Sequence, residues 1–232
     1  MSVKSYPAVH GELATLARIR EGYSLSRIGD GELKVMDGHG YSREPENPKL
    51  SKEIRLVASK PSQRCLVGIP TMDPKGSKYR TISEDGTPVG WFRHKERFCK
   101  FLSPDVEYYS ALITRPDCGE WMLTVEYAKE IQSIWLGKRV AVIGSADNKI
   151  HKAVEMTQPA IHIECPYREA YREIDNLEAA ALAVDVDIVL ICAGVTATCL
   201  ANRLSPRVQA VDLGSVGGFM CKMLGAEKWN TD

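Results

Sequence analysis

Short apolar runs alternate with amphipathic stretches through the second half of the chain. The runs VAVIG and IVLIC are apolar at nearly every position, which is typical of strands buried on both faces of a sheet. The stretches between such runs place apolar residues three and four positions apart, as amphipathic helices do. We expect strands at 138–144, 160–165, 187–194 and 208–214, and helices at 147–156, 167–184 and 196–204. Strands that alternate with helices indicate a parallel sheet with right-handed crossovers.

The first half shows the same two patterns less regularly. We expect helices at 10–22, 47–60, 91–102 and 120–135, a short helix through Val35 and Met36, and strands at 23–28, 64–70 and 106–114. Residues 71–90 hold most of the turn-forming residues of this half. We therefore expect a long loop there, a feature that is usually functional or mobile.

Together these elements predict an α/β fold with a Rossmann-like, mostly parallel sheet, helices on both faces and an elaborated N-terminal half. A chain of 232 residues suits one large domain or two small ones that share a core. We see no internal repeat or low-complexity segment, and one unit fits better than two separable domains. The expected domain covers 1–232, with an N-terminal part at 1–135 and a Rossmann-like C-terminal part at 136–232.

Composition adds constraints on compartment and partners. Thirty basic residues balance thirty acidic ones, so no global field favours nucleic acid or an anionic membrane. The N-terminus holds no apolar run long enough for a signal peptide, and no later segment is long enough to span a bilayer. The seven cysteines are scattered and include no C-x-x-C pair, which favours a reduced cytoplasmic protein without a zinc site.

The stretch YSLSRIGDGELKVM, residues 23–36, carries the most suggestive chemistry. Asp30 and Glu32 lie two residues apart where a strand turns into a helix, and Arg27 lies just before Gly29. Carboxylate oxygens suit Mg²⁺ or Mn²⁺, and an arginine adds a fixed fork for a phosphate or carboxylate. Alternatively, Asp30 caps the helix and Glu32 stabilises its first turn. Spacing alone does not separate these two interpretations.

Two other features could bind a ligand, although ordinary structural roles also explain the residues of each. Gly194 and Thr196 open a helix after a strand, where backbone N–H groups can face a phosphate, but both are also ordinary turn and cap residues. The basic and aromatic cluster at 78–100 suits a nucleic-acid surface, yet acids dilute it and an amphipathic helix explains it better. Neither G-x-G-x-x-G nor G-x-x-x-x-G-K-[ST] occurs, so NAD binding and P-loop hydrolysis lose their main support.

Five blocks of the sequence, taken in order, resemble the GT-D type glycosyltransferases, a family long known only as a domain of unknown function. The blocks are YSLSRIGDGEL (23–33), YYSALITRP (108–116), IWLGKRVAVIG (134–144), IHIECPYREAY (161–171) and IVLICAGVTATCLANRLSPRVQAVDLGS (188–215). Any one block is weak evidence, but five in the family's order cover nearly the whole chain.

The resemblance implies a Rossmann-like fold, a nucleotide-sugar donor that is usually a UDP-sugar, and Mn²⁺ or Mg²⁺ at the D-x-E motif, here Asp30-Gly31-Glu32. It further implies a set of donor-binding residues: Arg27 and Gly29 beside the motif, Ser110 and Arg115 in the central block, and Gly194 and Thr196 in a late loop. A metal and arginines would stabilise the charge on the departing nucleoside diphosphate.

Three positions depart from the family's usual pattern. Ile143 stands where a glutamate is usual, Val195 where the family has proline, and Ser215 where it has histidine. These departures lie where an acceptor or a general base would act, so the resemblance assigns neither.

The leading hypothesis is a metal-dependent glycosyltransferase that moves a sugar from a nucleotide-sugar to a hydroxyl. Asp30 and Glu32 would hold the metal, Arg27 and Arg115 the diphosphate, and Asp212 would deprotonate the acceptor. The acceptor classes left open are a glycan, a protein side chain and a hydroxylated DNA base, which would have to be flipped out of a duplex. The alternatives are a non-catalytic nucleotide- or nucleic-acid-binding module on the same fold and a Rossmann-like enzyme that uses another phosphorylated ligand. The sequence leaves the oligomeric state open, a homo-oligomer included.

Overall fold

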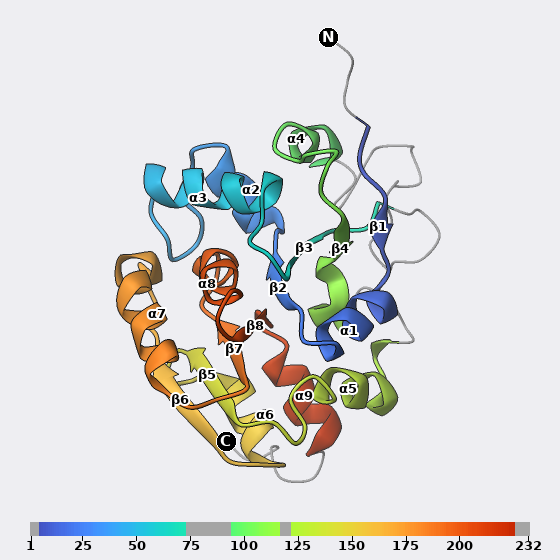
Figure 1. Cartoon of the computed structure of the whole chain (residues 1–232), viewed down its shortest axis with the longest axis vertical. Coiled ribbons are helices and arrows are strands. Elements are labelled where there is room, and N and C mark those ends of the chain that lie inside the picture. Colours follow the sequence, from blue (N-terminus) through green and yellow to red (C-terminus); the bar gives the residue numbers. More distant parts are fainter. Residues whose placement is uncertain (1–4, 73–93, 117–121, 226–232) are drawn as a thin grey trace.

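Eight strands form one sheet in the computed structural model of the chain, which describes residues 5–72, 94–116 and 122–225 (Figure 1). The strands are β1 Val9–His10, β2 Ser24–Arg27, β3 Cys65–Ile69, β4 Tyr108–Ser110, β5 Val140–Gly144, β6 Ala160–Glu164, β7 Ile188–Cys192 and β8 Gln209–Asp212. Their order across the sheet is β1-β4-β3-β2-β8-β7-β5-β6, and every neighbouring pair runs parallel. The prediction of a mostly parallel α/β sheet is confirmed.

Helices cover both faces of the sheet, because alternate residues of its strands face opposite sides. In β5, Val140 and Val142 belong to one hydrophobic cluster, whereas Ala141 and Ile143 belong to the other. The first cluster also holds side chains of α1 Glu12–Arg20, α5 Val125–Gln132, α6 Lys149–Glu155 and α9 Gly217–Leu224. The second holds those of α2 Asp30–Met36, α3 Pro48–Ser59, α4 Lys95–Cys99, α7 Ile174–Ala183 and α8 Thr196–Leu204. In Figure 1, α3, α7 and α8 accordingly lie on one side of the strands and α1, α5 and α9 on the other.

The chain leaves two central strands in opposite directions. β2 and β8 are neighbours, paired through Leu25 and Val211, but β2 leads to α2 on one face and β8 leads to α9 on the other. Where connections diverge in this way, a crevice opens at the carboxyl edge of a parallel sheet. The turn between β2 and α2, which carries Asp30, therefore lies at that crevice.

The strand expected at 106–114 is shorter than predicted. It ends at Ser110, where a 3₁₀ helix, Ala111–Thr114, begins. The Ser110 hydroxyl oxygen accepts a hydrogen bond from the Leu112 N–H (3.1 Å), a local bond that competes with continued strand pairing. The chain thereby turns at the end of β4 and runs along the carboxyl edge of the sheet.

Several predicted helices are also shorter than expected. The helix expected at 120–135 is α5, which begins after Thr124, whose hydroxyl accepts a hydrogen bond from an N–H of the first turn (3.1 Å). The helix expected at 167–184 is α7, preceded by a second 3₁₀ helix, Ala170–Glu173. Within the described residues, the one expected at 91–102 is α4. No helix in the described ranges is long and apolar enough to cross a membrane.

Besides the two 3₁₀ helices, one strand and one helix were not predicted, and two predicted features cannot be compared in full. β1 is only two residues long, too short to show a pattern. α9 begins with Gly217 and Gly218, and glycine is a poor helix former. Most of the loop expected at 71–90 and of the basic cluster at 78–100 lies outside the described residues.

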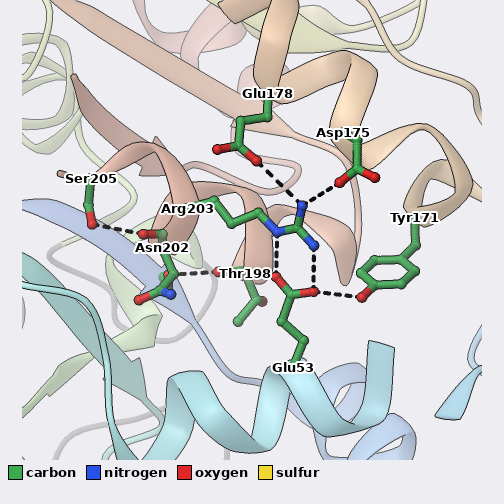
Figure 2. A network of polar contacts seen from close by, with 9 residues as sticks. Glu53, Tyr171, Asp175, Glu178, Thr198, Asn202, Arg203 and Ser205 are labelled. Atoms are coloured by element: carbon green, nitrogen blue, oxygen red, sulfur yellow. Dashed lines mark hydrogen bonds and ion pairs between the residues drawn. The ribbon is translucent and has the colours of Figure 1, made fainter. Parts of the chain in front are cut away.

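A polar network joins helices from the two halves of the chain (Figure 2). Arg203 of α8 donates to both carboxylate oxygens of Glu53 in α3, at 2.6 and 2.9 Å. The same guanidinium contacts Asp175 at 2.6 Å and Glu178 at 3.4 Å, both on α7, and the Tyr171 hydroxyl donates to Glu53 at 2.6 Å. The network fixes α3, α7 and α8 relative to one another on one face of the sheet.

Candidate active site

A cleft of about 670 Å³ lies at the carboxyl edge of the sheet. Loops that follow β2, β3, β4, β5, β7 and β8 line it, together with the segment around Tyr41 and the Tyr167 side chain. Small-molecule sites typically have volumes of roughly 300–1,000 Å³. The cleft is therefore large enough for a ligand of cofactor size.

The cleft gathers most of the residues that the sequence singled out. Seven of the nine line it: Arg27, Gly29, Asp30, Glu32, Arg115, Gly194 and Asp212. The other two, Ser110 and Thr196, are fully buried. Ser110 Oγ donates to the Glu12 carboxylate (2.9 Å), and Thr196 Oγ1 donates to Glu44 Oε1 (2.9 Å). Because both hydroxyls are buried and bonded to glutamates, the geometry does not favour the predicted contact of Ser110 and Thr196 with a ligand. That contact stays a prediction.

Arg27 ends β2, lines the cleft and contacts two other segments of the chain. Nε donates to the Asp212 carbonyl and Nη2 to Asp212 Oδ1, both at 2.9 Å. Nη1 donates to the Thr114 hydroxyl and to the Ala111 carbonyl, the latter at 3.4 Å. Protein acceptors therefore occupy four of the five guanidinium donors, and only 16% of the side chain is exposed. Arg27 thus holds the segment that leads directly into Arg115.

Asp212 is the ion-pair partner of Arg27 at the end of β8. It is 2% exposed, and its Oδ1 also accepts a hydrogen bond from the Gly214 N–H (2.9 Å). A carboxylate held by an arginine and a backbone N–H is poorly placed to take a proton from an incoming group. The geometry favours an orienting role for Asp212 over the general base that the sequence suggested.

The D-G-E stretch forms the first turn of α2. Gly29 is the N-cap, and Glu32 Oε2 accepts a hydrogen bond from the Gly29 N–H (2.7 Å), as in a capping box. Glu32 therefore stabilises the helix start, as the simpler interpretation expected. Asp30 is not the cap: it is the first helical residue, is exposed and lines the cleft. The first turn of α2 therefore contains both the helix cap and the candidate ligand site.

Glu32 sits where negative charge is incompletely balanced. Burial raises the pKa of its carboxyl to about 7, and repulsion from Asp212 adds to the rise. The Gly29 N–H and the Arg27 charge oppose this rise in pKa without cancelling it. A cation bound at this turn would relieve the imbalance.

Gly31 separates the two acids for a steric reason. A Cβ at this position would lie 2.6 Å from the Tyr41 ring, so only glycine lets that ring close over the start of α2. Burial raises the pKa of the Tyr41 hydroxyl, the nearby Asp30 and Glu32 raise it further, and Arg115 lowers it. One aromatic side chain therefore lies near both acids and the arginine of the cleft.

Sequence reasoning missed the aromatic side of the cleft. Tyr41, Arg43 and Tyr167 line it, and the Arg43 guanidinium stacks 3.3 Å from the centre of the Tyr167 ring. These residues come from irregular loops that are more than 120 positions apart, as 43 and 167 are numbered. A single sequence carries no periodic signal that such residues meet.

The donor set fits one kind of metal site. Among the described residues, no group of three or more His, Cys, Asp or Glu side chains is placed to hold a metal ion. Asp30 and Glu32 nevertheless offer two hard carboxylates in one turn that lines the cleft. Mg²⁺ and Mn²⁺ are commonly held by one or two carboxylates, with waters and substrate phosphates completing their shell. These residues therefore fit a metal shared with a phosphorylated ligand.

Two named relatives match most of this chain. "Probable glycosyl transferase Gly" of Streptococcus gordonii is 21% identical over 206 residues, which cover 85% of this chain and 30% of that protein. "Glycosyltransferase GlyD" of Streptococcus pneumoniae serotype 4 is 24% identical over 208 residues, 85% of this chain and 25% of that protein. The matched region thus spans less than a third of the length of either relative.

Solved structures share the fold. One, described as "The highly conserved domain of unknown function 1792 has a distinct glycosyltransferase fold", matches with a TM-score of 0.79 at 21% identity, over 98% of this chain and 85% of that chain. "A New Glycosyltransferase (DUF1792) from Streptococcus sanguinis" matches with a TM-score of 0.77 at 20% identity, over 97% and 88% of the respective chains. The profile of the family "Glycosyltransferase GT-D fold" matches residues 25–218. The chain therefore belongs to the glycosyltransferases of the GT-D fold.

Proposed function

We propose that the chain transfers a sugar from a nucleotide-sugar, in the first instance a UDP-sugar, to a hydroxyl group with the help of Mn²⁺ or Mg²⁺. The observation that carries the proposal is the meeting of Asp30, Glu32 and Arg115 in one cleft at the carboxyl edge of the sheet. Two acids beside an arginine suit a metal-bound diphosphate, because the acids hold the cation and the arginine faces the phosphates. The family to which the chain belongs supports the same reaction class.

The cleft residues divide this work between them. Asp30 and Glu32 would hold the metal, which when bound would neutralise charge on the departing diphosphate. Arg115 would bind the phosphates, since most donors of Arg27 are committed to Asp212 and the segment before Arg115. Arg27 would then contribute mainly by positioning Arg115.

The general base is better sought outside Asp212. Asp147, on the loop after β5, is exposed and lines the cleft. It makes no hydrogen bond or ion pair with another described residue, so its carboxylate is available to a substrate hydroxyl. The acceptor that carries this hydroxyl is a glycan, a protein side chain or a hydroxylated DNA base.

Calorimetric titration of UDP tests the proposed site. We expect binding with Mn²⁺ that is lost with EDTA and weakened at least about tenfold in Asp30→Asn, because a lost carboxylate removes a metal ligand. Arg115→Gln should weaken UDP binding with Mn²⁺ still required. Arg139→Gln, which changes exposed ion pairs far from the cleft, is the matched control and should bind UDP as the parent does.

The same proteins separate the proposal from its alternative. Nucleotide binding without release of UDP from any nucleotide-sugar would favour a non-catalytic nucleotide-binding module. Absence of binding for every nucleotide and nucleotide-sugar, with Mn²⁺ or Mg²⁺, would contradict the proposal.

A further inference from the structure

A side pocket of about 130 Å³ adjoins the main cleft. It shares Tyr41, Arg43, Tyr167 and Gly194 with the cleft, but it also has a wall of its own that includes Glu44. None of the steps assigned to the metal and diphosphate uses Glu44.

Two strained turns lie near this side pocket. Ser42 and Glu169 have φ of 53° and 54°, a left-handed conformation that costs a residue other than glycine about 1 kcal/mol. Tyr41 and Glu44 exchange backbone hydrogen bonds of 2.8 and 2.9 Å across the first turn, and the Glu169 N–H donates to the Arg43 carbonyl (3.0 Å). Backbone strain of this kind concentrates at functional sites. The Glu169–Arg43 hydrogen bond therefore joins the two turns directly.

Glu44 lines the pocket and has one carboxylate oxygen without a partner among the described residues. The residue is only 7% exposed. Its Oε1 accepts hydrogen bonds from the Thr196 hydroxyl (2.9 Å) and the Tyr171 N–H (3.0 Å), whereas Oε2 accepts none from the described residues. Oε2 is not among the fully enclosed polar atoms that lack a partner, so it is open to solvent and can accept a hydrogen bond from a ligand.

Two aromatic side chains contribute to the pocket wall. Tyr41 and Tyr167 line it, Tyr167 is 54% exposed, and the Arg43 guanidinium stacks on the Tyr167 ring. This contact stabilises one position of the ring. A ligand with a flat apolar face and a hydrogen-bond donor at its rim would match the aromatic rings and Glu44.

A pyranose ring meets both conditions better than uracil does. Its hydroxyls donate hydrogen bonds, while its axial C–H groups form a face that packs on an aromatic ring. The ring N–H of uracil lies between two carbonyl oxygens, which a carboxylate would repel. The side pocket is therefore suited to a sugar.

We infer that the side pocket binds a pyranose ring, with Glu44 Oε2 accepting a hydrogen bond from a ring hydroxyl and Tyr167 packing against the ring face. The inference rests on the proposed function for the source of the sugar, which is either the transferred sugar of the donor or a sugar of the acceptor. In either case Glu44 is a specificity residue that contacts substrate.

Glu44→Gln removes the proposed acceptor for a sugar hydroxyl and keeps the hydrogen bonds that this residue makes within the protein. Glutamine keeps Oε1 as acceptor for Thr196 and the Tyr171 N–H, and replaces Oε2 by an amide nitrogen. The control is Glu53→Gln, another partly buried glutamate, which lies in the Arg203 network (Figure 2). Glu53→Gln should lower the unfolding temperature without changing sugar recognition.

Calorimetry with Mn²⁺ then compares UDP, UDP-glucose, UDP-galactose and UDP-N-acetylglucosamine, and saturation-transfer NMR compares the free monosaccharides. If the pocket holds the donor sugar, Glu44→Gln and Tyr167→Ala should each weaken the preferred UDP-sugar about three- to tenfold and leave UDP unchanged. If it holds an acceptor sugar, the UDP-sugars should be unaffected and the monosaccharide signals should fall.

Other outcomes overturn the inference. Equal weakening of UDP and UDP-sugars in Glu44→Gln would identify a nucleoside pocket, and unchanged binding of all probes would identify a structural glutamate. If the parent protein binds no nucleotide, the proposed function fails, and the monosaccharide NMR alone decides whether the pocket holds a sugar.

Discussion

At the scale of single residues, Gly214 and Arg27 depend on each other. Gly214 has a φ of 52°, and its N–H donates to the Asp212 carboxylate that also holds Arg27. A Cβ at this position would lie 2.2 Å from Arg27 Nη2. Glycine is therefore needed both for the turn after β8 and for the room that Arg27 occupies.

Gly214→Ala should damage both the fold and the cleft. We expect the free energy of unfolding to fall by about 1 kcal/mol for the left-handed backbone and by a further amount for displaced Arg27. UDP binding with Mn²⁺ should weaken as well. Gly137→Ala is the control, because Gly137 also has positive φ (78°) but nothing within 4 Å of a Cβ. Urea unfolding and calorimetry measure the two effects, and indistinguishable variants would refute the steric account of Gly214.

Replacing Asp147 or Asp212 by asparagine should affect turnover and UDP binding differently. We expect Asp147→Asn to lower transfer or donor hydrolysis about 100-fold or more at unchanged UDP affinity, as loss of a general base does. Asp212→Asn keeps an oxygen for Arg27 and Gly214, so it should mainly reduce stability and UDP affinity. Turnover at saturating donor distinguishes the two, and the reverse pattern would restore Asp212 as the base.

The sequence predicted those site residues that lie close together along the chain. Arg27, Asp30 and Glu32 stand close together at a strand-to-helix turn, so their shared cleft was predictable. The spare oxygen of Glu44 was not, because its neighbours Thr196 and Tyr171 are distant in sequence and only the folded chain brings them together. The family resemblance identified Arg115, but not the hydrogen bonds of Arg27 to Ala111 and Thr114 that hold the segment before it.

At the scale of elements, α9 packs unusually close to α6 at the edge of the cleft. A Cβ on Gly217 would lie 2.3 Å from the Ile150 N and 2.5 Å from the Lys149 carbonyl carbon. These are backbone atoms, which cannot move aside as a flexible side chain would. Gly217 and Gly218 lower the helix propensity of this segment, which is why α9 was not predicted. Gly217 is also the residue that lets α9 pack against α6.

Gly217→Ala should therefore cost about 2–3 kcal/mol of unfolding free energy, as overpacking between two backbones does. The neighbouring Gly218→Ala should be neutral or slightly stabilising, because its Cβ would lie 3.6 Å from a flexible Lys149 carbon and alanine favours helix. Chemical unfolding of the two variants checks the difference. Equal stability would show that α6 and α9 can separate without cost.

Elements built on strong apolar runs were predictable, and those set by side-chain caps were not. β5 and β7 are apolar throughout and appear where expected. β4 stops early because the Ser110 side chain bonds to the backbone two residues on. Such a local bond competes with strand pairing in a way that hydrophobic pattern does not reveal.

At the scale of the whole molecule, each half of the chain forms one side of the sheet. β1 to β4 come from the first half and β5 to β8 from the second, and they meet at the single β2–β8 border. The apolar pattern predicted a parallel sheet but not the order of its strands, because order depends on which helices pack together. The Arg203 network joins α3 of the first half to α7 and α8 of the second (Figure 2).

Arg203→Met should destabilise the protein by about 2–4 kcal/mol, because it leaves Glu53 partly buried without its cation. Arg139→Met is the control: its side chain is 54% exposed, against 26% for Arg203, and exposed ion pairs contribute under about 1 kcal/mol. Urea unfolding measures both. A similar small loss in the two variants would show that the network does not hold α3 to α7 and α8.

The proposed function depends above all on a metal held by the Asp30–Glu32 turn. The most direct measurement is release of UDP from a panel of UDP-sugars by the parent protein and by a folded Asp30→Asn variant, each with Mn²⁺ and with EDTA. The account predicts slow release from one sugar that requires Mn²⁺ and is lost in Asp30→Asn. Release that persists in EDTA or in Asp30→Asn, or no release from any nucleotide-sugar with either metal, would contradict it.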